Sequence, residues 1–297
     1  MPQEDKISIV VATDNHYAIL LSALLKSIEV NHKTSEKIDV YVIDDGISPS
    51  SKKKLQSQVN PAMTSLYWFK TNDVIPPDVK MPVDKSAFPL TTYLRLFAPY
   101  IIPRDVKKVI YLDVDMLVLT DISKLWHTDL NGNLFGAVPD LAEIFASEWG
   151  GVQNYKELGF APDTKYFNAG MMVIDAFKWR EEDITNKVIK SIHDNLSSAN
   201  FPDQYGLNIT LANKWHVLDR GWNSFAVLDR KDPYIIHFLD IKPIFKSYNC
   251  NKDYQDEFYK YLRLTPWKNH KPVSDFRRLS RKAFNKAKKL VKGFLSR

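Results

Sequence analysis

Two aspartates separated by one residue are the side chains in this sequence best suited to chemistry. Asp113 and Asp115 flank Val114 and lie between the apolar runs 109–112 and 116–119. Carboxylates inside apolar sequence are costly to bury unless a positive group neutralises them. Side chains two residues apart in an extended chain point to the same side, so the pair predicts a site for a hard divalent cation. The alternative is a strand end whose acids bond to a neighbouring loop or to an arginine.

The sequence offers no glycine-rich loop to hold phosphate groups. Neither G-x-x-x-x-G-K-[ST] nor G-x-G-x-x-G occurs, and the chain has only 10 glycines. A bound nucleotide would therefore need a metal ion and cationic side chains around its diphosphate. This argues against a P-loop nucleoside triphosphatase, a Rossmann dehydrogenase and a nucleotidyltransferase with a glycine-rich loop.

The elements that position the aspartates alternate between strands and helices. The continuous β-branched run at 7–12 predicts a buried parallel strand, and the apolar-rich segments 38–43 and 64–69 predict a second and a third strand. Helical patterns separate them, and one of these, 49–59, follows a Ser48 N-cap. This alternation predicts a parallel sheet, in which ligands bind beyond the carboxyl ends of the strands.

The second half of the chain is expected to complete the sheet. Further strands are predicted at 106–112, 134–138 and 169–174, and helices at about 179–197 and 204–213. From residue 215, short apolar runs alternate with turn-forming residues, and the composition becomes basic near 267–272. The sequence shows no internal repeat and no low-complexity linker.

Length and composition suit one large α/β domain with an appendage, or two modest domains. The chain has 297 residues, of which 44% are hydrophobic and 26% charged. Its single cysteine, Cys250, excludes an internal disulfide and favours a reducing compartment. We expect no secretory signal, since acidic residues precede a short apolar run, and no run reaches the roughly 18 apolar residues of a membrane span.

The C-terminal residues form a basic amphipathic pattern. Residues 271–297 carry ten basic residues and one acidic residue, while the chain as a whole has a net charge of +6. Apolar residues recur at helical spacing opposite the lysines and arginines, at Phe276, Leu279, Ala283, Phe284, Ala287, Leu290, Val291, Phe294 and Leu295. This pattern predicts binding to an anionic membrane surface, and the alternative is a helix docked on the protein. Nucleic acid is not an expected partner, because the rest of the chain is mildly acidic.

Read in order, several segments of the chain resemble glycosyltransferase family 8, in particular its bacterial galactosyl- and glucosyltransferases of surface-glycan assembly. The resemblance extends over about residues 7–245. The segments are 11–14 with Tyr17, 91–96, 109–115, Leu125-Trp126, 167–170, 202–204, and 235–238 followed by Lys242-Pro243.

The resemblance implies a single nucleotide-sugar-binding α/β domain of the A type, Rossmann-like with a mixed central sheet, over residues 1–268. The basic tail would occupy 269–297. The implied cofactor is Mn²⁺, with Mg²⁺ as the alternative ion, bound by Asp113, Asp115 and His237. The implied partners are a UDP-hexose donor and a glycan, glycolipid or glycoprotein acceptor. The expected location is the cytoplasm, at the inner face of the membrane.

The same resemblance implies roles for the donor site. Asp14 would bond the uracil base and Tyr17 would stack on it, while Lys242 would meet the phosphates. The sugar hydroxyls would be bound by Asp140, Asn168 and Asp203, with Gln204 beneath the anomeric carbon. The implied donor-binding residues are Ala12, Thr13, Asp14, Tyr17, Arg95, Asp113, Val114, Asp115, Asn168, Ala169, Asp203, Gln204 and Lys242; the implied catalytic residues are Gln204, Asp203 and Asp140.

The implied reaction transfers galactose or glucose with retention of anomeric configuration. Gln204 is a poor nucleophile, so the resemblance favours front-face attack by the acceptor, with the leaving phosphate taking its proton. Asp203 is the competing candidate for a nucleophile that would form a covalent intermediate.

Other interpretations remain open on the sequence alone. His237 follows an apolar pair and suits a core histidine, Arg95 could pair with a carboxylate such as Asp140, and 167–170 could be a turn before a strand. The segment from His237 to Lys242 is one residue shorter than is usual in the family and lacks its glycine, and Ile244 stands where tryptophan is common. This departure supports a rival hypothesis, a catalytically silent nucleotide-sugar-binding protein. A membrane-surface adaptor that acts through its tail is the third hypothesis.

Overall fold

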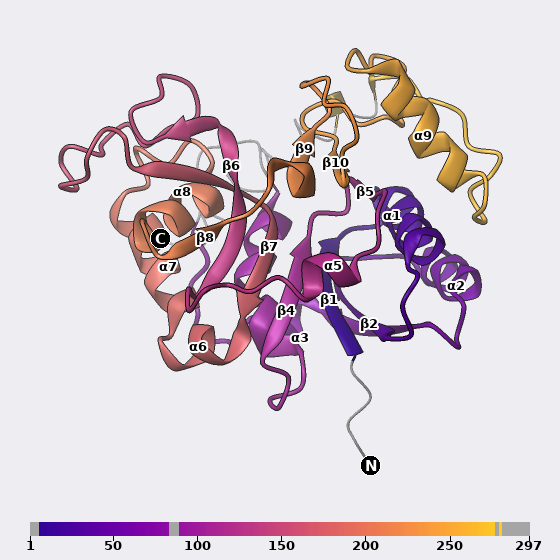
Figure 1. The fold of residues 1–297 in the computed structure, drawn as a ribbon, viewed down its shortest axis with the longest axis horizontal. Coiled ribbons are helices and arrows are strands. Elements are labelled where there is room, and N and C mark those ends of the chain that lie inside the picture. The colour runs from indigo at the N-terminus through magenta and orange to yellow at the C-terminus, as the bar shows by residue number, and fades with distance from the viewer. Residues whose placement is uncertain (1–5, 83–88, 277–278, 281–297) are drawn as a thin grey trace.

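The computed structural model describes residues 6–82, 89–276 and 279–280 of the chain. Within these residues, a seven-stranded sheet lies at the centre and a three-stranded sheet lies beside it (Figure 1). Helices cover both faces of the large sheet (Figure 1). The bounds of its strands are β1 Lys6–Thr13, β2 Lys37–Asp44, β3 Thr64–Lys70, β4 Lys108–Leu112, β6 Phe135–Ile144, β7 Lys165–Asp175 and β8 Trp215–Val217.

The large sheet is mixed, as expected. Its strand order is β3-β2-β1-β4-β7-β6-β8. The first four of these strands are parallel, whereas β7 runs antiparallel to both of its neighbours, β4 and β6. The carboxyl ends of β1, β2 and β4 therefore meet at one edge, where Asp14 and Asp113 follow β1 and β4.

The helices and short 3₁₀ segments connect these strands. The α-helices are α1 Ala18–Asn31, α2 Pro49–Gln58, α3 Thr71–Val74, α4 Ala98–Ile101, α5 Ser123–Trp126, α6 Ala176–Glu181, α7 Ile184–Asp194, α8 Pro202–Thr210 and α9 Lys252–Leu262; the 3₁₀ segments are η1 Leu90–Phe97 and η2 Arg220–Asn223. The predicted cap of α2 is present, because the Ser48 hydroxyl accepts a hydrogen bond from the Ser51 amide and Pro49 opens the helix.

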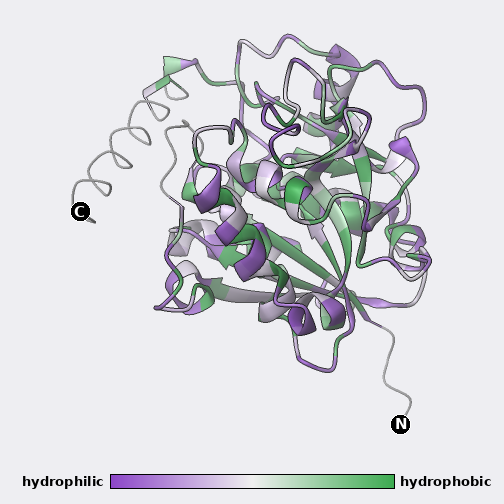
Figure 2. Ribbon diagram, turned by 90° about the vertical axis from the view of Figure 1, so that its left-hand side faces the viewer, coloured by the Kyte–Doolittle hydropathy of each residue, from purple (hydrophilic) through white to green (hydrophobic). Residues whose placement is uncertain are grey.

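Two apolar cores, one on each face of the large sheet, explain the continuous apolar runs of its strands. Along β1, Ile9 and Val11 point into the core beneath α1, and Val10 and Ala12 point into the core on the opposite face. Figure 2 shows the apolar strands enclosed between helices of mixed polarity. Burial on both faces holds the strand ends rigidly, which suits them to present side chains at the edge.

Several expectations about elements are corrected by the structure. Asp113 and Asp115 lie in a turn after β4, not in an extended chain. The strand expected at 134–138 continues to Ile144 and so contains Asp140, and residues 167–170 lie inside β7 and do not form a turn. The helix expected at 179–197 is two helices, α6 and α7, separated near Asp183, whose φ is +50°. Helix α9 was not predicted.

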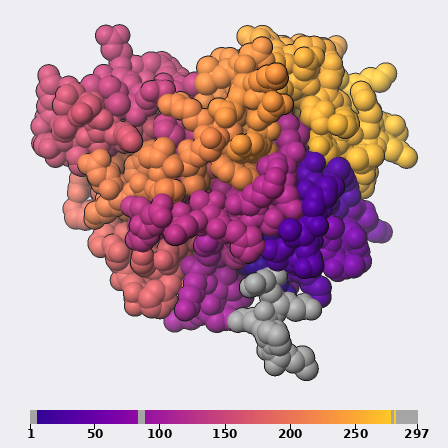
Figure 3. Space-filling model, in the orientation of Figure 1, coloured from indigo at the N-terminus to yellow at the C-terminus, as the bar shows by residue number. Residues whose placement is uncertain are grey.

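The small sheet places strands from the C-terminal part of the chain beside the edge of the large sheet. It has the order β5-β10-β9, with bounds β5 Met116–Val118, β9 Ser224–Phe225 and β10 Ile235–His237. Helix α9 packs against α1, where the Asn31 amide donates to the Tyr261 hydroxyl at 2.8 Å. In the space-filling view, the yellow C-terminal segment lies against the indigo N-terminal part (Figure 3).

The first residues of the expected tail are still attached to the domain. Phe245 and Val273 form a bridge, and the Lys246 amide donates to the Val273 carbonyl at 2.9 Å. Most of the predicted amphipathic stretch, 277–278 and 281–297, lies outside the described residues. Among the residues that are described, no helix is long and apolar enough to cross a membrane.

Candidate active site

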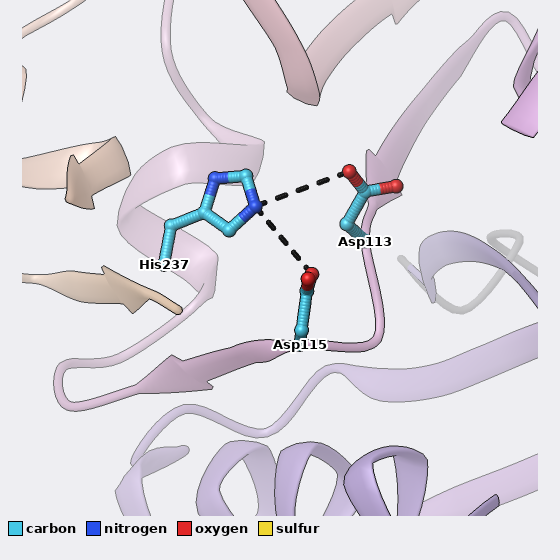
Figure 4. Close-up of side chains that lie close together, drawn as sticks. All are labelled: Asp113, Asp115 and His237. Carbon is cyan, nitrogen blue, oxygen red and sulfur yellow. Dashed lines mark ion pairs between the residues drawn. The ribbon is translucent and has the colours of Figure 1, made fainter. Parts of the chain in front are cut away.

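Asp113, Asp115 and His237 converge at the junction of the two sheets (Figure 4). Asp113 follows β4, Asp115 precedes β5, and His237 ends β10. Antiparallel pairing of β5 with β10 sets His237 opposite Met116, and the Phe238 amide donates to the Asp115 carbonyl at 2.9 Å. The strand register of the small sheet therefore places the His237 imidazole next to the aspartate pair.

The three side chains present a compact set of ligand atoms. Their ligand atoms lie within 4.8 Å of one another. The imidazole Nε2 is 3.4 Å from Asp115 Oδ1 and 4.0 Å from Asp113 Oδ2. His237 is only 3% exposed and hydrogen-bonds through its other nitrogen, Nδ1, at 2.9 Å to Asn223 Oδ1. Two carboxylates and an imidazole held in this way fit a divalent cation.

Arg95 forms ion pairs with two carboxylates of the site, those of Asp113 and Asp203. Its Nη2 lies 3.1 Å from Asp113 Oδ1, and its Nε lies 3.0 Å from Asp203 Oδ2. The Tyr111 hydroxyl also donates to Asp113 at 2.8 Å. Arg95 thus pairs with Asp113 and Asp203, and not with Asp140, the carboxylate considered from the sequence. Burial disfavours the charged carboxylate and raises the pKa of Asp203 even though Arg95 opposes the shift.

Lys242 neutralises Asp115 from the opposite side. Its Nζ lies 2.5 Å from Asp115 Oδ2 and donates to the Phe238 carbonyl at 2.7 Å. Burial disfavours charge on Asp115, yet Lys242 and His237 together hold the pKa of its carboxyl well below its ordinary value. Burial likewise disfavours the ammonium, but Asp115 outweighs it and raises the pKa of Lys242. The short His237–Lys242 segment therefore still brings its lysine into the site.

Three of the residues implied to lie around the sugar, Asp140, Asn168 and Gln204, form one hydrogen-bonded group. Asn168 Nδ2 donates to Asp140 Oδ2 at 2.7 Å, and Gln204 Nε2 donates to the same oxygen at 3.2 Å. Gln204 Oε1 accepts from the Ala169 amide at 3.0 Å. Asp203, beside Gln204 at the start of α8, contacts Arg95 instead. The structure thus brings the implied sugar-binding residues next to the aspartate pair.

The residues implied to bind the nucleotide base lie at the carboxyl end of β1. Asp14 Oδ1 accepts from the amides of His16 at 2.9 Å and Tyr17 at 3.3 Å, which forms the turn into α1. Tyr17 lies near enough to Lys242 to influence its pKa. Ala12, Thr13 and Val114 are buried around this edge. The implied base and phosphate residues therefore occupy neighbouring positions.

Sequence reasoning missed two residues of the site, Asn223 and the close-packed position Gly170. Asn223 is 1% exposed and contacts both His237 and Asn168. A Cβ at Gly170 would lie 2.5 Å from His237 Cε1 and 2.9 Å from Asp113 Oδ2. Asn223 stands in a turn-rich stretch without a distinguishing signal, whereas a glycine two residues after Asn168 in 167–170 is a signal of close approach between backbone and side chains.

Comparisons with known proteins agree with this architecture. The family model described as "Glycosyl transferase family 8" matches residues 8–247. General stress protein A of Bacillus subtilis is 31% identical over 291 residues, which cover 90% of this chain and 96% of that protein. Glycosyltransferase GlyF of Streptococcus pneumoniae is 26% identical over 82% of this chain, and the matched region spans 58% of GlyF.

A solved structure extends the comparison to the fold. The galactosyltransferase LgtC in complex with donor and acceptor sugar analogs superposes with a TM-score of 0.71 at 25% identity, over 89% of this chain and 100% of that one. The fold expected from the sequence, a single mixed α/β domain of the glycosyltransferase A type, is confirmed. The resemblance noted in the sequence is also confirmed, because the chain belongs to glycosyltransferase family 8.

Proposed function

We propose that this glycosyltransferase moves galactose or glucose from a UDP-sugar to a bacterial surface glycan, glycolipid or glycoprotein, with retention of anomeric configuration and with Mn²⁺ as cofactor. The observation that carries the proposal is the convergence of Asp113, Asp115 and His237 within 4.8 Å. The galactosyltransferase LgtC, crystallised with donor and acceptor sugar analogs, supports a nucleotide-sugar donor.

The site residues suit departure of a nucleoside diphosphate. Asp113, Asp115 and His237 would hold the divalent ion, which when bound supplies positive charge to the leaving diphosphate. Lys242 lies beside the same carboxylate and can donate to phosphate oxygens from the chain itself. Arg95 stays paired with Asp113 and Asp203 and so keeps the acidic cluster neutral enough to accept an anionic donor.

The contacts of Gln204 and Asp203 favour front-face attack over a covalent intermediate. Gln204 is a neutral amide whose two ends are bonded to the Ala169 amide and to Asp140. The Asp203 carboxylate is buried and paired with Arg95, which lowers its nucleophilicity. In the front-face reaction the acceptor hydroxyl attacks the anomeric carbon, and its proton passes to the departing phosphate. Asp140 and Asn168 would orient the sugar hydroxyls.

The test measures UDP release by the purified full chain. UDP-galactose and UDP-glucose are each supplied with Mn²⁺ or with EDTA, together with extracted bacterial glycolipid as acceptor. We expect turnover only with Mn²⁺, and a loss of about 10²–10³-fold in Asp115→Asn, the scale for removal of one electrostatic stabiliser. Asp256→Asn, on the exposed face of α9, is the matched control and should keep full activity.

Two outcomes would contradict the proposal. Equal turnover in EDTA would refute the metal dependence. Donor binding without turnover for either sugar would instead support a catalytically silent nucleotide-sugar-binding protein.

We also propose that the basic C-terminal stretch associates with anionic membrane surfaces, at the inner face of the cytoplasmic membrane. Among the described residues, Leu264 lies before this stretch and is 59% exposed, and Phe276 and Leu279 lie within it and are 77% and 56% exposed. These apolar side chains adjoin a run of lysines and arginines, a combination typical of interfacial segments.

Vesicle sedimentation tests this association with the full chain. Replacing Lys286, Lys288 and Lys289 by Gln should weaken the binding free energy to phosphatidylglycerol vesicles by about 1 kcal/mol per lysine. The fraction of protein that sediments with the vesicles should fall accordingly. Replacing three exposed lysines of the domain, Lys53, Lys54 and Lys124, removes the same charge and should leave binding unchanged. Equal loss in both variants would refute a specific role for the tail.

A further inference from the structure

Two consecutive backbone amides of β7 fix the orientation of the polar side chains in the site. The Gly170 amide donates to Asn168 Oδ1 at 3.0 Å, so this oxygen is an acceptor and Asn168 Nδ2 faces Asp140. The Ala169 amide donates to Gln204 Oε1, so Gln204 Nε2 also faces Asp140. A backbone amide can only donate, and the side-chain amides therefore have one consistent arrangement.

Asn223 transmits this orientation to the imidazole. Its Nδ2 donates to Asn168 Oδ1 at 2.9 Å, which leaves its Oδ1 to face His237 Nδ1 at 2.9 Å. A carbonyl oxygen only accepts, so the imidazole proton must reside on Nδ1. The lone pair of Nε2 is then directed at Asp113 and Asp115.

We propose that Asn223 is a positioning residue, which holds His237 in the Nδ1–H tautomer and thereby prepares Nε2 to bind the metal ion. Asn223 contacts neither aspartate of the pair among the described hydrogen bonds, so it acts through the histidine. Pairing of β9 with β10 keeps the two side chains together, because Phe225 and Ser224 lie opposite His237 and Ile236. The inference rests on the proposed metal dependence.

The chain of hydrogen bonds also joins the two halves of the site. From His237 it passes through Asn223 and Asn168 to Asp140, and from Asp140 to Gln204. Four of these residues are less than 7% exposed, so water does not replace the lost partner easily. Loss of Asn223 should therefore weaken the metal site first, and the sugar-binding side only through Asn168.

The test compares two substitutions that separate the contacts of Asn223. Asn223→Leu removes both hydrogen bonds at similar volume. Asn223→Asp keeps an acceptor for the Nδ1–H group but loses the donor to Asn168. Asn154→Leu is the control, because Asn154 is another buried asparagine, bonded to Tyr205 and Asn195 away from the metal ligands.

Mn²⁺ affinity of the full chain without nucleotide, followed by electron paramagnetic resonance, is the first measurement. We expect about 10–100-fold weaker binding in Asn223→Leu, the scale for loss of an outer-shell partner. Asn223→Asp should stay within about threefold of the unchanged chain, because the contact to Nδ1 remains. The Asn154→Leu control should bind as the unchanged chain does, even if its unfolding temperature falls.

The tautomer itself is the second measurement. With saturating Mg²⁺, long-range ¹H–¹⁵N spectra of the imidazole should show Nδ1 protonated in the unchanged chain and in Asn223→Asp, with His237→Gln giving the assignment. Unaltered Mn²⁺ binding by Asn223→Leu, or a protonated Nε2 in the unchanged chain, would overturn the inference while leaving the proposed function intact. Absence of Mn²⁺ binding by the unchanged chain would overturn both.

Discussion

Lys242 and Asp115 form a partly buried ion pair inside the proposed metal site, with Nζ 2.5 Å from Oδ2. The same carboxylate is needed by a divalent ion, so ammonium and metal compete for it. A bound diphosphate changes this balance, since it offers the ammonium other oxygens. Lys242 is therefore expected to oppose metal binding alone and to favour metal binding together with a nucleotide.

Replacing Lys242 by Met should separate these two effects. Without nucleotide, Mn²⁺ should bind about tenfold more tightly, equivalent to ~1.4 kcal/mol, because the competing charge is gone. With Mn²⁺ present, UDP should bind more weakly, since a phosphate partner is lost. Titration calorimetry measures both affinities.

Lys246→Met is the control for this prediction, as Lys246 lies four residues along and is exposed. It should leave both affinities unchanged. If Lys242→Met weakened Mn²⁺ binding in the absence of UDP, competition between the ammonium and the metal would be the wrong description.

Gly170→Ala should impair the metal site through crowding. The added Cβ would lie 2.5 Å from His237 Cε1 and 2.9 Å from Asp113 Oδ2, so the imidazole must move. We expect at least tenfold weaker Mn²⁺ binding and a loss of about 1–3 kcal/mol in the free energy of unfolding. Paramagnetic resonance and urea unfolding provide the two measurements.

Gly136→Ala on β6 controls for a methyl group added to the sheet. Its Cβ would meet the ends of flexible side chains, at 3.0 Å from Leu130 and 3.2 Å from Leu218. Its Mn²⁺ affinity should equal that of the unchanged chain. Equal affinities in both glycine variants would show that the contact with His237 is unimportant.

Asp203 should make stability depend on pH. Burial raises the pKa of this carboxyl above its ordinary value, so the folded state binds its proton more tightly than the unfolded chain does. Its contribution is complete below the unfolded pKa, near 3.8, and is lost as the pH rises through the folded pKa. Asp203→Asn should lack this decline, which begins above the unfolded pKa, as measured by urea unfolding over a range of pH.

Asp256→Asn, an exposed carboxylate on α9, should retain the pH profile of the unchanged chain. Parallel profiles for the unchanged chain and Asp203→Asn would mean that Asp203 titrates normally in the fold.

Much of the fold could be predicted because strand burial leaves a strong signal. The runs 7–12 and 38–43 match β1 and β2 closely, since strands buried on both faces need apolar residues almost throughout. The run 64–69 matches β3, an edge strand whose side chains are mostly only partly buried. Helix α9 was missed because its buried face is made of three tyrosines, one phenylalanine and one leucine among charged residues. The break between α6 and α7 depends on Asp183 in a left-handed conformation, which no glycine marks.

The candidate site could be predicted from the sequence only where its residues form a recognisable motif over a few neighbouring positions. The pair Asp113 and Asp115 is visible in the sequence, and the family resemblance added His237 across more than 120 positions. Its buried supports were harder to find. Asn223 acquires its role from the pairing of β9 with β10, which is a property of the tertiary structure. Arg95 was named, but its two carboxylate partners required the structure.

The three proposed ligands come from both sheets, since Asp113 follows β4, Asp115 precedes β5 and His237 is the last residue of β10. A single ion shared by these residues would act as a cross-link between the two halves of the molecule. Loading should then slow hydrogen exchange along β10 and stiffen the segments that continue from it to α9. Metal binding at Asp113, Asp115 and His237 would thus also make the C-terminal end of the domain more rigid.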